Sequence, residues 1–272
     1  MNSLDNLDHD PGERGNGVRL DGKRALIIGA SSGIGYAVAK AYAEYGAEVT
    51  ILADDAGITR AAESISALTG NPVTPLQCDI TDRGRLHQVL ASLERIDILV
   101  QNAGFERLTP LQDEDPAIED TFRKIIDVNL LGAYYVTREL IARIPDGGRI
   151  IYTASTYSKY AIARMSAYAS SKHALLGMMR SFADELGPRR ITVNAVCPGW
   201  VNTEFANRSV RKIANDSGRT IEAVSNDVFS LQAIEGHLEP DDIIGGYLFF
   251  ASGLARDITG QSLHIDRGEY QN

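Results

Sequence analysis

A glycine-rich turn between an apolar run and a helical stretch constrains the fold of this chain most strongly. Arg24–Ile28 contains β-branched residues, GASSGIG begins at Gly29, and helical periodicity continues to Tyr45. Glycines in such a turn let a phosphate group approach the backbone at the positively polarised start of a helix. A plain strand–helix turn also favours glycine, but three glycines within seven residues favour phosphate binding. The cofactor-binding residues expected here are Gly29, Ser31, Ser32, Gly33, Ile34 and Gly35.

Short apolar runs alternate with helical stretches along the rest of the chain. Strands are expected at Arg24–Ile28, Glu48–Ala53, Val73–Cys78, Asp97–Val100, Arg149–Thr153, Ile191–Val196 and Ser262–Ile265. Helices are expected at Tyr36–Tyr45, Ala56–Leu68, Asp82–Leu93, Asp115–Gly132, Ser166–Leu186 and Pro240–Ser252. This alternation predicts an α/β fold, a Rossmann-type doubly wound parallel sheet of about seven strands with helices on both faces.

One domain covers residues 18–272 in this interpretation, and the polar, weakly helical stretch 201–236 is expected to form a lid over the site. The first seventeen residues are polar and acidic, lack the apolar core of a signal peptide, and read as a disordered tail. No apolar run approaches the roughly 18 residues that a membrane-spanning helix needs.

Charge and cysteine usage exclude several function classes. The net charge of −9 argues against nucleic acids and anionic membranes as main partners. Cys78 and Cys197 each end an apolar run and are interpreted as buried thiols in a reducing cytoplasm. The five histidines show no metal-ligand spacing, so no metal site is expected.

Polar or small residues follow several of the predicted strands, where an α/β sheet binds its ligands. Asp54 and Asp55 follow the second strand, where one carboxylate would accept hydrogen bonds from an adenosine ribose and the other would cap the next helix. A turn is the alternative interpretation for Asp79, Asn102 and Gly104. Further candidate contacts, these three included, are Asp79, Ile80, Asn102, Ala103, Gly104, Pro198, Gly199, Val201 and Thr203.

Tyr168 and Lys172 stand one turn apart on the amphipathic helix Ser166–Leu186, so their side chains share a face. A cation beside a phenol favours the phenolate, and such a tyrosine could exchange a proton with an alcohol or ketone. Taken alone, the pair is more often a solvated helix face. Ser155 lies thirteen residues before Tyr168, and Asn129 sits within a helical pattern where a buried amide needs hydrogen-bond partners.

Taken together, these residues resemble the short-chain dehydrogenase/reductase family from about Leu20 to Gly268. The glycine turn, the Asn-Ala-Gly of 102–104, the Tyr-x3-Lys pair with Ser155 and Asn129, and Pro198-Gly199 followed by Thr203 occur in the family's order. Gln101 stands where Asn is commoner, and Arg267 stands where the family usually has glycine, which puts the local packing there in doubt.

The resemblance implies a role for each catalytic residue. Tyr168 would be the general acid/base, and Ser155 would hydrogen-bond the substrate oxygen. Lys172 would bind the nicotinamide ribose and lower the pKa of Tyr168, while Asn129 would hold a water linking Lys172 to solvent. Tyr168 and Lys172 therefore also count among the cofactor-binding residues. The resemblance also implies a homotetramer, in which the helices at 115–132 and 166–186 pair with their symmetry mates.

NAD is expected over NADP, because Asp54 would repel a 2′-phosphate, although many NAD-using relatives place their aspartate one residue earlier, at Ala53. The substrate site is expected to include Ser155, Tyr157, Tyr168 and Trp200. The resemblance implies that its walls also come from 105–107, 156–157, 163–165 and the lid. The CPGWV stretch is similar to that of 3-hydroxybutyrate dehydrogenases, but Arg164 is the only nearby cation for a carboxylate and is more often solvated at such a position. We therefore expect a secondary alcohol or ketone as substrate.

Two alternatives remain open. One is a 3-oxoacyl-thioester reductase using NADPH, with a basic carrier-protein surface near Arg123, Lys124 or Arg138. The other is a dinucleotide-binding protein without turnover, which the intact set of four catalytic residues disfavours.

Overall fold

A seven-stranded parallel sheet forms the centre of the computed structural model, which describes residues 18–271. The strand order is β3-β2-β1-β4-β5-β6-β7, and all pairs are parallel. The bounds are β1 Arg24–Ile28, β2 Glu48–Ala53, β3 Val73–Gln77, β4 Ile98–Gln101, β5 Arg149–Thr153, β6 Thr192–Pro198 and β7 Ser262–Ile265. The predicted doubly wound sheet of seven strands is confirmed.

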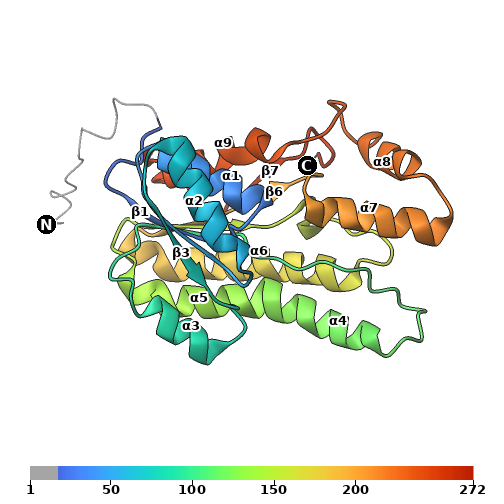
Figure 1. The fold of residues 1–272 in the computed structure, drawn as a ribbon, viewed down its shortest axis with the longest axis horizontal. Coiled ribbons are helices and arrows are strands. Elements are labelled where there is room, and N and C mark those ends of the chain that lie inside the picture. Colours follow the sequence, from blue (N-terminus) through green and yellow to red (C-terminus); the bar gives the residue numbers. More distant parts are fainter. Residues whose placement is uncertain (1–17, 272) are drawn as a thin grey trace, which may run out of the picture.

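Helices cover both faces of this sheet (Figure 1). On one face lie α1 Gly33–Glu44, α2 Gly57–Thr69 and α9 Ile244–Ala251, which share a core with β1 and β2. On the other lie α3 Arg83–Leu90, α4 Ala117–Ile126, α5 Ala133–Leu140 and α6 Ser166–Leu186. Their apolar stripes meet the alternating side chains of fully buried strands, so each face of the sheet has its own core.

The stretch predicted as one helix over 115–132 is longer and interrupted. It begins as α4, widens into the π-helical segment Asp127–Gly132, and continues as α5 to Leu140. Gly132 lies within this helix and packs closely against Ile80, because a Cβ at position 132 would lie 2.6 Å from Ile80 Cδ1. The glycine therefore reflects packing against the loop after β3 and does not end the helix.

Two more helices, α7 Glu204–Ser217 and α8 Ile221–Phe229, fill most of the predicted lid. Figure 1 shows them beside each other at one end of the molecule, away from the sheet. They share a small apolar cluster of Val210, Ala214 and Val224, with Trp200 and Ile213 packed against it. The predicted tail, residues 1–17, lies outside the described residues, and no helix within 18–271 is long and apolar enough to cross a membrane.

Candidate active site

A cavity of about 730 Å³ opens at the carboxyl ends of the strands. It is lined by residues from the turns after β1, β2, β3 and β4, by the start of α6, and by the segment from Pro198 into α7. Parallel strands end at the same edge, so residues far apart in sequence meet here. Nearly all the predicted site residues line this cavity; Gly35 and Asn129 lie behind its wall.

The glycine turn has the close backbone approaches that its spacing predicts. Gly29 has a positive φ of 78°, and a Cβ on it would lie 2.5 Å from Ala103 Cα. A Cβ on Gly35 would lie 2.1 Å from the Gly29 carbonyl oxygen. The Ser32 side chain makes no capping bond to α1, which leaves the first N–H groups of that helix facing the turn. This geometry fits the phosphates of a dinucleotide.

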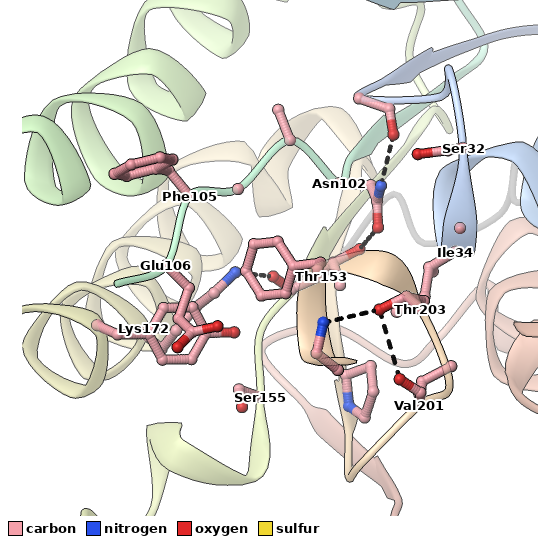
Figure 2. A pocket seen from close by; sticks show the side chains of 18 of the residues that line it. Ser32, Ile34, Asn102, Phe105, Glu106, Thr153, Ser155, Lys172, Val201 and Thr203 are labelled. Carbon is pink, nitrogen blue, oxygen red and sulfur yellow. Dashed lines mark hydrogen bonds between the residues drawn. The ribbon is translucent and has the colours of Figure 1, made fainter. Parts of the chain in front are cut away.

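Asn102 holds the glycine turn in place through side-chain hydrogen bonds (Figure 2). Its Nδ2 donates to the Gly29 carbonyl at 2.7 Å, and its Oδ1 accepts from Thr153 Oγ1 at 3.1 Å. Thr153 Oγ1 also lies 2.7 Å from the Tyr247 hydroxyl. The predicted ligand contact at Asn102 is thus also a brace across the ends of β1, β4 and β5.

Of the two aspartates after β2, Asp55 contacts the start of the next helix, as one of them was expected to do. Asp55 accepts hydrogen bonds from Gly57 N at 2.8 Å, at the start of α2, and from Ser31 Oγ at 2.6 Å. Asp54 is exposed and lines the cavity. Asp79 also lines it, but its carboxylate accepts hydrogen bonds from the backbone and hydroxyl of Thr81, as a turn residue would.

The segment after β6 forms the opposite wall. Gly199 N donates to the Ile265 carbonyl at 3.1 Å, and a Cβ on Gly199 would lie 2.8 Å from Asp266 Cα. Thr203 caps α7 by accepting from Ala206 N at 3.2 Å (Figure 2). Pro198, Val201 and Trp200 line the cavity between these points.

Ser155 and Tyr168 face the cavity from separate elements. Ser155 caps the short 3-10 turn Thr156–Ser158, and its hydroxyl accepts from Tyr157 N at 3.2 Å. Burial and the nearby Glu106 carboxylate raise the pKa of Tyr168, while hydrogen bonding to Ser155 lowers it. Without a ligand, burial therefore outweighs the expected lowering of this pKa by Lys172, and the phenol is protonated at neutral pH.

Lys172 lies one turn behind Tyr168 on α6, with its ammonium 5.6 Å from the centre of the Tyr168 ring. It donates to the Thr153 carbonyl at 2.7 Å (Figure 2). Burial lowers the pKa of Lys172 to about 8. The solvated helix face considered for this pair is excluded, because Lys172 is only 3% exposed.

Asn129 lies in the π-helical segment and is buried. Its Oδ1 accepts from Phe105 N at 2.6 Å, and its Nδ2 donates to the Phe105 carbonyl and to Ser171 Oγ, both at 3.0 Å. The side chain therefore fixes the loop after β4 against α6. Widened helix turns occur often at functional sites.

Several residues outside the predicted catalytic and cofactor-binding sets also shape the site. Glu106 lies in the predicted substrate wall 105–107, and Phe205 and Ser209 lie in the predicted lid. Glu106, Phe205, Ser209 and Glu269 line the cavity. Glu106 directly follows the loop that Asn129 fixes, so its position after the Asn-Ala-Gly motif was the available signal. Nothing in the sequence near the C-terminus pointed to Glu269.

Two arginines differ from their expected surroundings. Arg267, where the family usually has glycine, has a φ of 56°, and its guanidinium donates to the His237 carbonyl at 2.7 Å and the Glu235 carbonyl at 3.2 Å. Arg164 is not simply solvated, because it forms an ion pair with Asp216 at the end of α7. Both arginines therefore tie the region of 201–237 to the rest of the fold.

Comparisons with known proteins agree with this geometry. Residues 29–269 match a family model described as enoyl-(acyl carrier protein) reductase. The chain is 32% identical over 256 residues to D-beta-hydroxybutyrate dehydrogenase from Cupriavidus necator, covering 92% of this chain and 98% of the relative. A short-chain type dehydrogenase/reductase from Mycobacterium marinum superimposes with a TM-score of 0.80 at 32% identity, covering 94% and 98%. A blue fluorescent protein from a metagenomic library, whose structure was solved in complex with NADPH, superimposes with a TM-score of 0.81 at 29% identity. The match covers 93% of this chain and 100% of that protein.

Proposed function

Because the chain belongs to the short-chain dehydrogenase/reductase family, we propose that it interconverts a secondary alcohol and a ketone using NAD(H), with Tyr168 as the general acid/base. The observation that carries this proposal is the meeting of Ser155, Tyr168 and Lys172 at a cavity that also contains the glycine turn. The fold and the oxidoreductase class follow from family membership; the cofactor, the substrate type and the residue roles are proposed here.

Each catalytic side chain has a role that its surroundings support. A protonated Tyr168 donates its proton to a ketone oxygen and recovers one from an alcohol in the reverse direction. Ser155 donates a hydrogen bond to the same oxygen and stabilises charge that develops on it. Lys172, held by the Thr153 carbonyl, stabilises the tyrosinate that forms. Asn129 keeps the loop after β4 in position, and a role in holding a water stays a prediction.

The dinucleotide supplies or accepts the hydride, and the residues at its expected site fit it. The glycine turn would hold the pyrophosphate, and Lys172 the nicotinamide ribose. Asp54 would hold the adenosine ribose and oppose a 2′-phosphate. Among the described residues that line the cavity, the cations are Lys124 and Lys172, and neither lies in the segments after β1 and β2.

The cofactor preference is tested by comparing kcat/KM for NAD and NADP in the wild type and in Asp54→Ala. Two like charges about 4 Å apart cost about 1–4 kcal/mol, so the variant should use NADP roughly tenfold better relative to NAD, or more. Asp55→Ala is the matched control, because loss of its bonds to Ser31 and α2 should impair both cofactors alike. A wild type that prefers NADP over NAD would refute the proposal.

Reduction of a 3-oxoacyl thioester is the second candidate, because the chain is 33% identical to a 3-oxoacyl-[acyl-carrier-protein] reductase from Rickettsia bellii. Arg123, Lys124 and Arg138 lie on α4 and α5 and offer a basic surface for such a carrier. Comparing the activity with acetoacetyl-CoA and with simple ketones separates the two candidates.

A homotetramer in the cytoplasm completes the proposal. The apolar Phe122 is 37% exposed on α4, and its burial against a second copy would favour assembly. Light scattering should give four times the 29.5 kDa chain mass, whereas the mass of one chain would count against the tetramer. Both cysteines are buried free thiols, which supports a reducing compartment.

A further inference from the structure

Glu106 is a buried carboxylate in the cavity that the proposed reaction does not use. It is 5% exposed and lines the cavity together with Ser155 and Tyr168. Figure 2 shows its carboxylate on the side of the cavity where Ser155 and Lys172 are drawn. Its charge reaches Tyr168 and Tyr157, because it raises the pKa of both phenols. Glu106 therefore lies next to the place where a substrate must bind.

The hydrogen bonds of Glu106 leave acceptor capacity unused. Ser209 Oγ on α7 lies 2.5 Å from one carboxylate oxygen and 2.6 Å from the other. A hydroxyl has one hydrogen and serves one oxygen at a time, whereas a carboxylate accepts about four hydrogen bonds. Burial raises the pKa of Glu106, and the charges of Arg107 and Arg208 act in the opposite direction.

A second carboxylate, Glu269, also lines the cavity, and the charges of both carboxylates raise the pKa of Tyr157. The Tyr160 hydroxyl donates to its Oε1, while its Oε2 is buried with no hydrogen-bond partner among residues 18–271. The cations among the described lining residues offer little compensation to a bound anion. Lys172 donates to the Thr153 carbonyl, and Lys124 is exposed, with its ammonium 4.9 Å from the centre of the Phe105 ring.

We propose that Glu106 determines substrate specificity by accepting a hydrogen bond from a second donor group of the substrate, a hydroxyl or an ammonium beside the reacting carbinol. The same carboxylate, together with that of Glu269, repels a substrate that carries a carboxylate at that position. This inference rests on the proposed alcohol–ketone chemistry and names the class of substrate. A simple alcohol leaves the free acceptors of Glu106 unused.

The test uses four matched four-carbon alcohols: 2-butanol, 2,3-butanediol, 3-amino-2-butanol and 3-hydroxybutyrate. The diol or the amino alcohol should show a kcat/KM about tenfold above that of 2-butanol, the scale of one hydrogen bond to a charged group. The better of these two identifies the donor as hydroxyl or ammonium. A 3-hydroxybutyrate kcat/KM equal to or above that of 2-butanol would overturn the proposal.

Variants separate substrate recognition from a structural role of Glu106 in holding α7. Glu106→Leu should abolish the preference for the second donor, while Ser209→Ala, which removes the other half of the same contact, should keep it. If both variants lost the preference for the second donor equally, Glu106 would act only by holding α7 in position. Glu106→Gln preserves the shape of the side chain and serves if the leucine variant folds poorly. It should raise the kcat/KM for 3-hydroxybutyrate about tenfold. Glu222→Gln, at an exposed position on α8, is the control and should not change this kcat/KM.

Binding can be followed without turnover, because Trp200 is the only tryptophan of the chain and lines the cavity. Titration of its fluorescence should give a lower Kd for the diol or amino alcohol than for 2-butanol, and this difference should vanish in Glu106→Leu. If none of the four alcohols is oxidised, the proposed function fails, and the titration still decides the recognition by Glu106. The same Kd difference in wild type and Glu106→Leu would overturn the inference.

Discussion

Replacement of Lys172 with methionine should stabilise the ligand-free protein while it removes activity. Methionine keeps the length and the apolar part of the side chain, but it removes a buried ammonium. A pKa that falls from 10.5 to about 8 on folding corresponds to about 3 kcal/mol of unfavourable free energy for the charged form. Loss of the charged hydrogen bond to the Thr153 carbonyl offsets about 1.5–3 kcal/mol of this gain.

The pH dependence is the sharper part of this prediction. Between pH 8 and 10.5 the folded chain binds fewer protons at Lys172 than the unfolded chain, so the free energy of unfolding rises with pH. The wild type should gain about 2 kcal/mol from this group between pH 7 and 9.5, while the methionine variant gains nothing from it. The penalty of the charged form is fully present below pH 8 and is lost as the pH rises.

Urea unfolding of both proteins at the two pH values measures this effect, because the other titrating groups cancel in the difference between the proteins. At pH 7 the variant should be at least as stable as the wild type, and a net gain of about 1 kcal/mol would raise Tm by roughly 2–4 °C. A variant that is less stable than the wild type by the same amount at pH 7 and 9.5 would refute the reasoning.

Three further predictions concern the proposed catalytic tyrosine and two glycines. Tyr168→Phe should lower kcat more than a hundredfold and leave NADH affinity nearly unchanged, as fluorescence titration would show; retention of a tenth of the activity would contradict its assignment. Gly35→Ala should weaken dinucleotide binding more than tenfold and lower Tm, because its Cβ would lie 2.1 Å from the Gly29 oxygen. Gly177→Ala, in the middle of α6 with open space around the new Cβ, should instead add about 1 kcal/mol of stability by urea unfolding.

The helix Ser166–Leu186 could be predicted with its correct bounds, because its apolar spacing is unbroken and depends only on local sequence. The helix that begins at α4 could not, because its continuation through Asn129 and Gly132 depends on tertiary contacts. The Asn129 side chain forms hydrogen bonds with Phe105 and Ser171 there, and close packing of Ile80 leaves no room for a side chain at Gly132. Local propensity disfavours both residues in a helix, and the long-range contacts outweigh it.

The candidate site shows the same division. Positions fixed by a motif, such as Tyr168 and Lys172, could be predicted, because their spacing on one helix sets their geometry. The upward shift of the Tyr168 pKa could not be predicted, because it depends on burial and on Glu106, which comes from another segment of the chain. Glu269 is brought in from beyond β7 by the folded sheet, and no local pattern marks it.

We expect α7 and α8 to open locally while the sheet stays folded, so that their amide protons exchange with solvent independently of the sheet. Its own core is three small or medium side chains, and polar ties such as those made by Glu106, Arg164 and Arg267 connect the region to the sheet. A segment with a small apolar core and few polar contacts to the rest of the fold has a lower free energy of local opening than the sheet. Amide protons of α7 and α8 should therefore exchange orders of magnitude faster than those of β1 and β4, and substitutions within these two helices should leave the folding of the sheet largely unchanged.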